Sequence, residues 1–469
     1  MTTRTDVLIV GAGPTGLTLA CDLARRGIAH RVIDRADRPS TASRAKTIQP
    51  RSLEVMDDLG VVDRIRALGA VHVPTRHYDH DRVTSEAVEA AIGVPPSPEF
   101  PHPAPIWISQ PFIEGILRDR LADHGGTVEF GTTATSLTQY DDHVAVSTGS
   151  GDIHARYVVG CDGGHSAIRR LSGIALDGTT YDRERWHLGD LEIDGLDRHC
   201  QHVWMSPEHG ILSLFPLPST NLWQFQASID PAIEDPEEPS LELFRRIFDE
   251  RAGVPGVRLH SPGWQSLYRI NVRMADRYRD RRVLLAGDAA HVHSPGGGQG
   301  MNTGIQDSYN LGWKLAAVLD GAPDDLLDSY QEERMPVART VLEDSTARLR
   351  MVTQAAADGD STFALRNLTD DFTTGLTIGY PDSSLNLTDQ AGMRAADGPH
   401  QDLRLFDLFR GPHWTLVADG NESLLVRPDG YIAARGPLDK VTQLQAGSYA
   451  RFGRSQRSTS STDRSRRTA

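Results

Sequence analysis

Short apolar runs separated by turn residues open the chain in the order strand, turn, helix, strand. Residues 7–10 are a continuous apolar run, Val-Leu-Ile-Val, which is typical of a strand buried on both faces. Apolar residues then recur at helical spacing from Leu17 to Ala24, and a second apolar run ends at Asp34. This pattern predicts a β-α-β unit built around a parallel sheet.

The middle of the chain has a strand-rich pattern. Residues 222–229 largely alternate polar and apolar side chains, which predicts a strand with one face on a core or pocket and the other toward water. Residues 241–248 interrupt this region with helical spacing. We therefore predict one antiparallel sheet between Tyr181 and Val272, joined by the excursion from Arg76 to Pro105. Its other strands are expected at residues 187–193, 202–205, 211–217 and 265–272.

The last third of the chain predicts a strand and a hairpin. Residues 403–408 and 414–417 are short apolar-rich stretches, and residues 424–433 surround the turn Pro428-Asp429-Gly430. Residues 454–469 are mostly Ser, Thr and Arg, with almost nothing to bury, which predicts disorder.

A glycine-rich turn follows the first predicted strand. Residues 11–16, Gly-Ala-Gly-Pro-Thr-Gly, lie between that strand and the first helix, in the G-x-G-x-x-G pattern of dinucleotide-binding folds. Asp34 ends the second strand at the offset of the acid that binds a ribose 2′-hydroxyl. The structural alternative is a helix cap with incidental glycines. An acid at Asp34 would repel a 2′-phosphate, so the turn favours FAD or NAD over NADP as the tightly bound ligand.

Two later segments contain similar turns. Four glycines lie between Gly296 and Gly300, shortly after Asp288, and a helix is expected from Asn302 to Leu319 with its positive end facing the same spot. Residues 157–170 are a further strand that runs into the turn Asp162-Gly163. Since no second G-x-G-x-x-G exists, these segments indicate one extended nucleotide ligand, although each alone could be a structural turn.

The ordered segments GAGPTG, CDGGHSAIR and GDAAHVHSPGGGQGMN closely resemble the class A FAD-dependent aromatic hydroxylases. These are the single-component monooxygenases of the para-hydroxybenzoate and phenol hydroxylase type, and the resemblance extends to polyketide hydroxylases and rifampicin monooxygenase. It covers most of residues 1–345. It implies FAD, NAD(P)H and O2, and hydroxylation of an aromatic compound, expected to be a polycyclic polyketide or related secondary metabolite, through a flavin C4a-hydroperoxide. Alternatives are a flavoenzyme of the same fold doing Baeyer-Villiger oxidation, epoxidation or reduction, or a non-catalytic FAD-binding protein.

The implied fold class is α/β. A Rossmann-like FAD-binding domain is expected at residues 1–75, 106–180 and 273–345, with an inserted antiparallel β-sheet substrate domain at residues 76–105 and 181–272. A helical connection at residues 346–390 would lead to a shortened thioredoxin-like α/β region at residues 391–453, followed by the disordered tail. A complete thioredoxin fold is not expected, because the stretch between Val417 and Leu424 is too short for that domain.

The resemblance also assigns cofactor-binding positions. Asp288 would bond the ribityl chain of FAD, with a helix N-cap as the alternative, and backbone N–H groups of residues 300–302 would stabilise negative charge on the reduced flavin. Arg44 would contact a phosphate or nicotinamide, Gln110 the ribose or adenine, and Asp162 backbone or Arg groups near the pyrophosphate. The expected FAD-binding residues are Gly11, Gly13, Pro14, Thr15, Gly16, Asp34, Arg35, Arg44, Gln110, Ala134, Asp162, Asp288, Pro295, Gly298, Gly300, Met301 and Asn302.

The sequence does not single out a catalytic or substrate-binding residue. His293, Pro295 and Arg44 are the catalytic candidates, although the hydroxylation needs little acid-base work from the protein. His291 is expected to pack and hydrogen-bond rather than to react. Candidate substrate contacts in the inserted sheet are Trp223, Tyr268 and Arg269, each of which is as well explained by a core or surface role.

The composition narrows the class of partner to small molecules. A formal net charge of -14 argues against nucleic acid or an anionic membrane. No apolar run approaches the ~18 residues of a membrane span, and no signal peptide precedes the first strand. The three cysteines, Cys21, Cys161 and Cys200, lack the spacing of a disulfide framework or metal site. We therefore expect a cytoplasmic monomer or homodimer that binds no metal, with an aromatic substrate and O2 as its partners.

Overall fold

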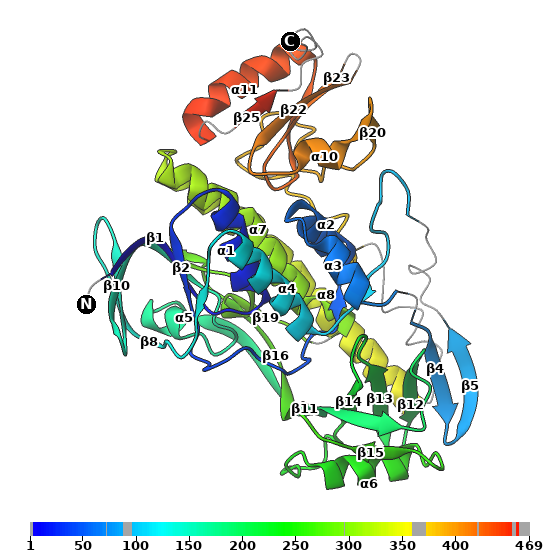
Figure 1. Ribbon diagram of the computed structural model, residues 1–469. Coiled ribbons are helices and arrows are strands. Elements are labelled where there is room, and N and C mark those ends of the chain that lie inside the picture. The colour runs from blue at the N-terminus through cyan, green and yellow to red at the C-terminus, as the bar shows by residue number, and fades with distance from the viewer. Residues whose placement is uncertain are drawn as a thin grey trace.

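The structure is a computed structural model that describes residues 3–71, 73–87, 96–294, 296–358, 372–419, 422–452 and 456–458. Two long helices, α7 (Gly300–Leu319) and α8 (Asp328–Asp358), run diagonally through the molecule (Figure 1). The N-terminal lobe and the C-terminal region lie around one end of this pair, and a second sheet lies at the far end of α8 (Figure 1).

The N-terminal lobe is built on the first sheet. Its strands follow the order β17-β18-β10-β1-β2-β7, and β1 is parallel to both β2 and β10. Val10 pairs with Ile33 and Gly160, and Gly160 pairs with Leu285, so these chains leave the sheet at one edge. Ligands of open α/β sheets bind at this carboxyl edge. The bounds are β1 (Thr3–Val10), β2 (His30–Ile33), β7 (Val128–Glu129), β10 (Gly151–Gly160), β17 (Arg279–Asp280) and β18 (Val283–Leu285).

The predicted β-α-β unit is confirmed by β1, α1 (Pro14–Arg25) and β2. Pro14 begins the helix, a position where its missing N–H costs nothing and its fixed φ fits. Leu17 and Leu23 have no exposed surface and belong to the main core. The other elements of this lobe are β3 (Thr47–Ile48), α2 (Pro50–Asp58), α3 (Val62–Leu68), β6 (Ile106–Trp107), α4 (Gln110–Asp123), β8 (Ala134–Gln139), β9 (Val144–Thr148) and α5 (Ala167–Leu171).

The predicted second sheet is also present, in the order β19-β16-β11-β14-β13-β12-β4-β5. The expected joining excursion contributes two strands, β4 and β5. Strand β4 pairs in parallel with β12 and antiparallel with β5. Two strands are longer than predicted, because the pairing of β11 with β16 continues to Leu176 and Ala275 beside the N-terminal lobe. The bounds are β4 (Thr75–Asp79), β5 (Arg82–Ala87), β11 (Leu176–Asp194), β12 (Gln201–Ser206), β13 (Gly210–Pro216), β14 (Leu222–Ser228), β15 (Arg258–His260), β16 (Gln265–Ala275) and β19 (His291–Val292).

One face of the second sheet is covered by α6 (Leu241–Arg251), the helix expected at residues 241–248. Ser240 caps it by accepting a hydrogen bond from the N–H of Leu243 at 3.1 Å. Phe244 stacks on Phe225 of β14 with ring centroids 4.4 Å apart. Because side chains alternate across a strand, the residues next to Phe225 point to the opposite face of the sheet.

The C-terminal region contains a sheet in the order β24-β23-β22-β25, against which α11 (Leu438–Phe452) packs. The hairpin around Pro428-Asp429-Gly430 is confirmed, because β23 and β24 pair across it. The bounds are β22 (Trp414–Asp419), β23 (Glu422–Val426), β24 (Ile432–Gly436) and β25 (Gln456–Ser458).

Three C-terminal expectations differ from the structure. Of residues 403–408, only Leu403 and Arg404 form a strand, β21 (Leu403–Arg404), which pairs with β20 (Pro399–His400). The rest belongs to α10 (Leu405–Phe409), where Asp397 accepts the N–H of Phe406 at 2.9 Å. Within the connection at residues 346–390, α8 extends to Asp358, and residues 372–390 are turns, bends and irregular segments without a helix; residues 359–371 lie outside the described residues. In the expected disordered tail, residues 456–458 form β25, which pairs with β22. The rest of the tail lies outside the described residues.

Two properties bear on the class of site. In the described parts of the chain, no helix combines the length and the apolar character needed to cross a membrane. The same residues contain no cluster of three or more His, Cys, Asp or Glu side chains that could hold a metal ion.

Candidate active site

The two glycine-rich segments meet at Thr15, in the first turn of α1. A Cβ added to either Gly287 or Gly304 would lie against the Thr15 side chain. Ser308 on α7 donates a hydrogen bond to the Thr15 carbonyl at 2.7 Å. The first turns of α1 and α7 therefore cross at positions where only glycine fits, and their positive ends lie close together at the carboxyl edge of the first sheet.

The space beside Gly13 is free of protein atoms, whereas the space beside Gly11 and Gly16 is filled. A Cβ on Gly11 or Gly16 would overlap backbone atoms, whereas a Cβ on Gly13 would meet no protein atom within 4 Å. Gly13 has φ -76, which any residue can adopt, and it precedes the first turn of α1. Neither packing nor backbone conformation among the described residues requires glycine here. The bare backbone at a helix N-terminus forms a cradle that fits a pyrophosphate.

Asp34 is tied to this cradle. Its carboxylate accepts the N–H of Ala12 at 2.7 Å and the N–H of Ala36 at 2.8 Å. An ionised carboxylate offers about four acceptor positions, so both oxygens can still accept a ribose hydroxyl. Asp34 therefore shapes the glycine turn in addition to the sugar contact expected for it.

Asp288 lies beside the first turn of α7. A Cβ on Gly300 would be 4.0 Å from Asp288 Oδ1 and 3.8 Å from Cδ2 of His293. The Asp288 side chain is exposed, yet burial raises its pKa against the opposing effect of His291 and Arg44. A ligand at the first turn of α7 can therefore reach the Asp288 carboxyl.

Asn302 fixes the start of α7. Its side-chain amide donates to the carbonyls of Thr47 and Gly298, and its oxygen accepts the N–H of Gln49 at 2.8 Å. Gly298 itself has a left-handed φ of 63, which favours glycine. The Asn302 side chain thus holds the Thr47–Gln49 segment against the start of α7. Only the backbone N–H of Asn302 remains for the predicted flavin contact. Met301 is half-buried beside it, and Pro295 lies outside the described residues.

Arg44 lies on a segment that bridges the two sheets. Its φ of 29 is left-handed, which is rare and costly for a residue other than glycine. Next to it, Ser43 donates its N–H and hydroxyl to the buried carboxylate of Asp190 at 2.7 and 2.5 Å. Gln224 on β14 donates to the Arg44 carbonyl at 3.1 Å. These bonds hold the exposed Arg44 side chain between the glycine turns and the second sheet.

Some predicted cofactor residues have structural partners. Asp162 accepts the hydroxyl of Ser166 and the N–H of Ala167, and so stabilises the start of α5. Gln110 bonds the Glu114 side chain and, through its backbone N–H, the carbonyl of Ala45. Two further expected residues are simply placed: Arg35 is exposed and Ala134 is buried.

The face of the second sheet opposite α6 looks toward the glycine turns. Three contacts show this: Ser43 bonds Asp190, Lys46 Nζ donates to Gln224 at 3.1 Å, and Tyr268 donates to the carbonyl of His293 at 3.5 Å. By strand alternation and register, this face carries half-buried side chains. They include Trp186, Leu188, Val203, Met205, Phe215, Gln226 and Tyr268, together with the polar Ser228 and Ser266.

The sequence analysis found only Tyr268 among these residues. The others alternate with core residues of the same strands, and the sequence does not say which of the two faces meets the glycine turns. Lys46 was also missed, although it is one of three lysines; its Nζ lies 4.0 Å from the Phe215 ring centroid and burial lowers its pKa to about 8.

Trp223 and Arg269 are not brought to this face. Trp223 is fully buried in the core beneath α6, where Arg198 lies over its ring. Arg269 is exposed and, next to Tyr268 on β16, points to the other side of that strand. The structure therefore gives no support for substrate contacts from these two residues.

Comparison with known proteins matches this arrangement. A profile described as "FAD binding domain" matches residues 4–345. The chain belongs to this family of FAD-binding proteins. A flavin-dependent monooxygenase of Mycobacteroides abscessus is 41% identical over 462 residues, which cover 91% of this chain and 96% of the relative. A rifampicin monooxygenase of Rhodococcus hoagii is 30% identical over 96% of this chain and 99% of its own length.

The fold of the family agrees as well. The crystal structure of aklavinone-11 hydroxylase in complex with FAD and aklavinone has a TM-score of 0.81 at 26% identity, covering 96% of this chain and 99% of that one. The protein is thus an FAD-dependent monooxygenase of α/β fold. The open space beside Gly13, the acceptor oxygens of Asp34 and the exposed carboxyl of Asp288 fit FAD.

Proposed function

We propose that the protein uses NAD(P)H and O2 to hydroxylate an aromatic substrate, and that this substrate is a polycyclic polyketide or a related secondary metabolite. The single observation that carries the proposal is the face of the second sheet opposite the glycine turns, which presents the half-buried apolar and aromatic side chains of Trp186, Leu188, Met205, Phe215 and Tyr268. Bound FAD would supply the electrons for activating O2 at the boundary between that face and α7.

The width of the face supports a polycyclic substrate. Tyr268 on β16 and Met205 on β12 lie at its two ends, with β11, β14 and β13 between them. At roughly 4.8 Å per strand, these five neighbouring strands extend over about 19 Å. Such a surface accommodates several fused rings, and Gln226 offers an amide for ring oxygens. The relatives named for rifampicin and aklavinone support the same class of substrate.

The cofactor would lie along the carboxyl edge of the first sheet. In this proposal the pyrophosphate rests on Gly13, Pro14 and Thr15, and Asp34 accepts a ribose hydroxyl. Asp288 bonds the ribityl chain, and the backbone N–H groups of Gly300 to Asn302 face the pyrimidine edge of the flavin, where helix α7 stabilises negative charge. The exposed Arg44 is placed to contact a phosphate or the nicotinamide nucleotide.

Product analysis with the FAD-loaded protein tests this function. We expect tetracyclic phenols to accelerate NAD(P)H oxidation and to yield products heavier by one oxygen atom, with the oxygen drawn from O2. Trp186→Ala should raise KM about tenfold, because the lost ring contact is worth roughly 1.4 kcal/mol. Tyr140→Ala is the matched control, since Tyr140 is an exposed aromatic residue, 49% accessible, on the N-terminal lobe.

The same assay separates hydroxylation from reduction and from a non-catalytic role, while Baeyer-Villiger oxidation and epoxidation, which also add one oxygen, are distinguished by the structure of the product. An unchanged KM in Trp186→Ala would remove the sheet face from substrate binding. A product that gained only hydrogen, or bound FAD without any O2 consumption across the panel, would contradict hydroxylation and favour a reductase or a non-catalytic FAD-binding protein.

A further inference from the structure

A buried polar chain runs beneath the first turn of α7. His291 has no exposed surface, and its Nε2 lies 2.6 Å from Asp307 while its Nδ1 lies 2.7 Å from Nε2 of His293. Arg334 donates to the other Asp307 oxygen at 2.7 Å. Burial raises the pKa of Asp307, but the neighbouring His291 and Arg334 outweigh burial and hold it below its ordinary value. Asp307 is therefore ionised and can only accept hydrogen bonds.

This chain fixes the tautomers of both histidines. Since Asp307 only accepts, Nε2 of His291 carries a hydrogen. With one ring hydrogen on His291, its Nδ1 accepts. Nε2 of His293 must then donate to it, which leaves Nδ1 of His293 as a bare acceptor. That nitrogen has no hydrogen-bond partner among the described residues, and His293 is only 6% exposed. A buried polar atom without a partner costs free energy, so its retention calls for a reason.

The position of His293 supplies a reason for retaining this unpartnered nitrogen. Its ring packs on Gly300, the first residue of α7, where the proposed function places the negative edge of the flavin. Burial lowers the pKa of His293 well below its ordinary value, so the ring is neutral near neutral pH. The charged and titratable groups that face it are His291, Asp307 on α7, Arg334 on α8, Asp288 on the preceding turn and Tyr268 on β16.

Resting on that proposed flavin position, we propose that His293 takes up one proton at Nδ1 when negative charge develops on the cofactor at the start of α7. A solvent proton forms the new N–H bond on the Nδ1 lone pair. The proton on Nε2 can pass to Nδ1 of His291, which places the positive charge beside Asp307. The two electrons come from the nicotinamide nucleotide as hydride, and the histidines are neither oxidised nor reduced. A nearby anion favours the charged imidazolium, which drives the uptake.

Redox titration of the FAD-loaded protein against a reference dye at several pH values tests the proposal. The dependence of the midpoint potential on pH counts the protons taken up per two electrons. The wild type should take up two protons while its reduced form shows the absorption spectrum of anionic flavin. His293→Gln should take up one. His187→Gln is the matched control, because His187 is also a buried histidine with an unpartnered Nδ1 but lies on the α6 side of the second sheet, and it should keep two.

Three outcomes overturn the proposal: one proton in the wild type, two protons with a neutral reduced-flavin spectrum, or two protons retained in His293→Gln. The wild-type count decides even if the variant does not retain FAD. The titration needs no aromatic substrate, so its failure is distinguishable from failure of the proposed hydroxylation.

Discussion

At the scale of single residues, the glycines illustrate what a motif predicts and what it leaves open. The G-x-G-x-x-G pattern correctly marked the crossing of strand and helix, but it treats Gly11, Gly13 and Gly16 alike. The structure separates them, because Gly11 and Gly16 are closed against backbone atoms and Gly13 faces open space. Asp162 shows the same limit, since its local bonds to the start of α5 do not follow from its place in a motif.

This difference between Gly13 and Gly16 predicts different effects for alanine substitutions at the two positions. Gly13→Ala should leave the apoprotein folded, at a cost of about 1 kcal/mol or less for the altered helix start, and should weaken FAD binding at least tenfold because the methyl group enters the cradle. Gly16→Ala should destabilise the apoprotein itself, since its Cβ would overlap the Gly11 carbonyl. Thermal unfolding without FAD, together with FAD titration, checks both. Normal FAD affinity in Gly13→Ala would contradict the cradle.

At the scale of elements, periodicity predicted the strands of both sheets well. It failed where a few residues decide: Asp397 turns residues 405–409 into a helix through a bond to the N–H of Phe406. Periodicity also did not indicate which face of the second sheet lies toward the glycine turns. Trp223 and Gln224 alternate on one strand, and only the packing of α6 against Trp223 shows which side each of them takes. Long-range packing of this kind has no local signal in the sequence.

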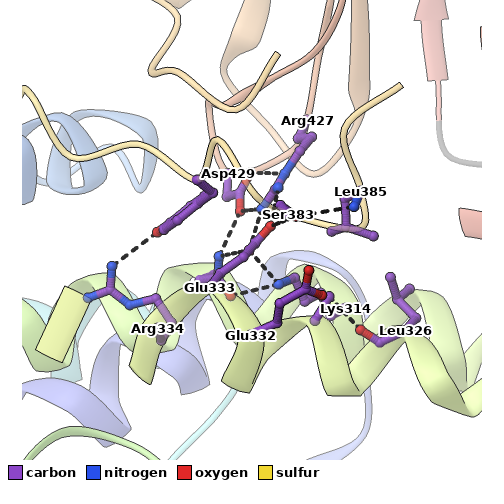
Figure 2. A network of polar contacts seen from close by, with 12 residues as sticks. Lys314, Leu326, Glu332, Glu333, Arg334, Ser383, Leu385, Arg427 and Asp429 are labelled. Carbon is purple, nitrogen blue, oxygen red and sulfur yellow. Dashed lines mark hydrogen bonds and ion pairs between the residues drawn. The ribbon is translucent and has the colours of Figure 1, made fainter. Parts of the chain in front are cut away.

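The elements α7, α8 and the C-terminal hairpin meet in a buried ionic network (Figure 2). The carboxylate of Glu333 on α8 forms ion pairs with Arg427 at 2.5 Å and with Lys314 at 2.7 Å. Arg427 also forms an ion pair with Asp429. Arg427→Met should cost about 3–5 kcal/mol, because it leaves Glu333 and Asp429 buried with fewer cations. Arg435→Met removes a 46% exposed partner of Glu422 and should change stability by less than about 1 kcal/mol. Urea unfolding measures both, and equal effects would contradict the network's role.

At the scale of the whole molecule, the buried carboxylates determine how stability depends on pH. In Glu333 and Asp307, burial raises the pKa, but other groups outweigh it. The charges of Arg427 and Lys314 at Glu333, and the charge of Arg334 with the hydrogen bonds from His291 and Arg334 at Asp307, hold both pKa values below the ordinary 4.5 and 3.8. A carboxyl with a lowered pKa in the folded state stabilises the protein above its unfolded pKa, and this stabilisation is lost as pH falls. Asp190, Glu114 and Asp288 act in the opposite direction, since burial raises their pKa.

The effect of Glu333 and Asp307 should dominate over that of the acids with raised pKa values. Protonating Asp307 leaves the fully buried Arg334 without its counter-charge, and protonating Glu333 leaves the buried Arg427 and Lys314 with one carboxylate fewer. Protonating Asp190, in contrast, relieves an acid that burial already disfavours. We therefore expect the free energy of unfolding to fall steadily as pH is lowered from about 4.5, with the C-terminal region and the N-terminal lobe lost in one transition since Glu333 joins them. Urea unfolding at a series of acidic pH values, followed by both near-ultraviolet circular dichroism and FAD fluorescence, measures this. Constant stability down to pH values below both ordinary pKa values, or separate transitions for the two signals, would show that the network neither stabilises the fold nor couples its parts.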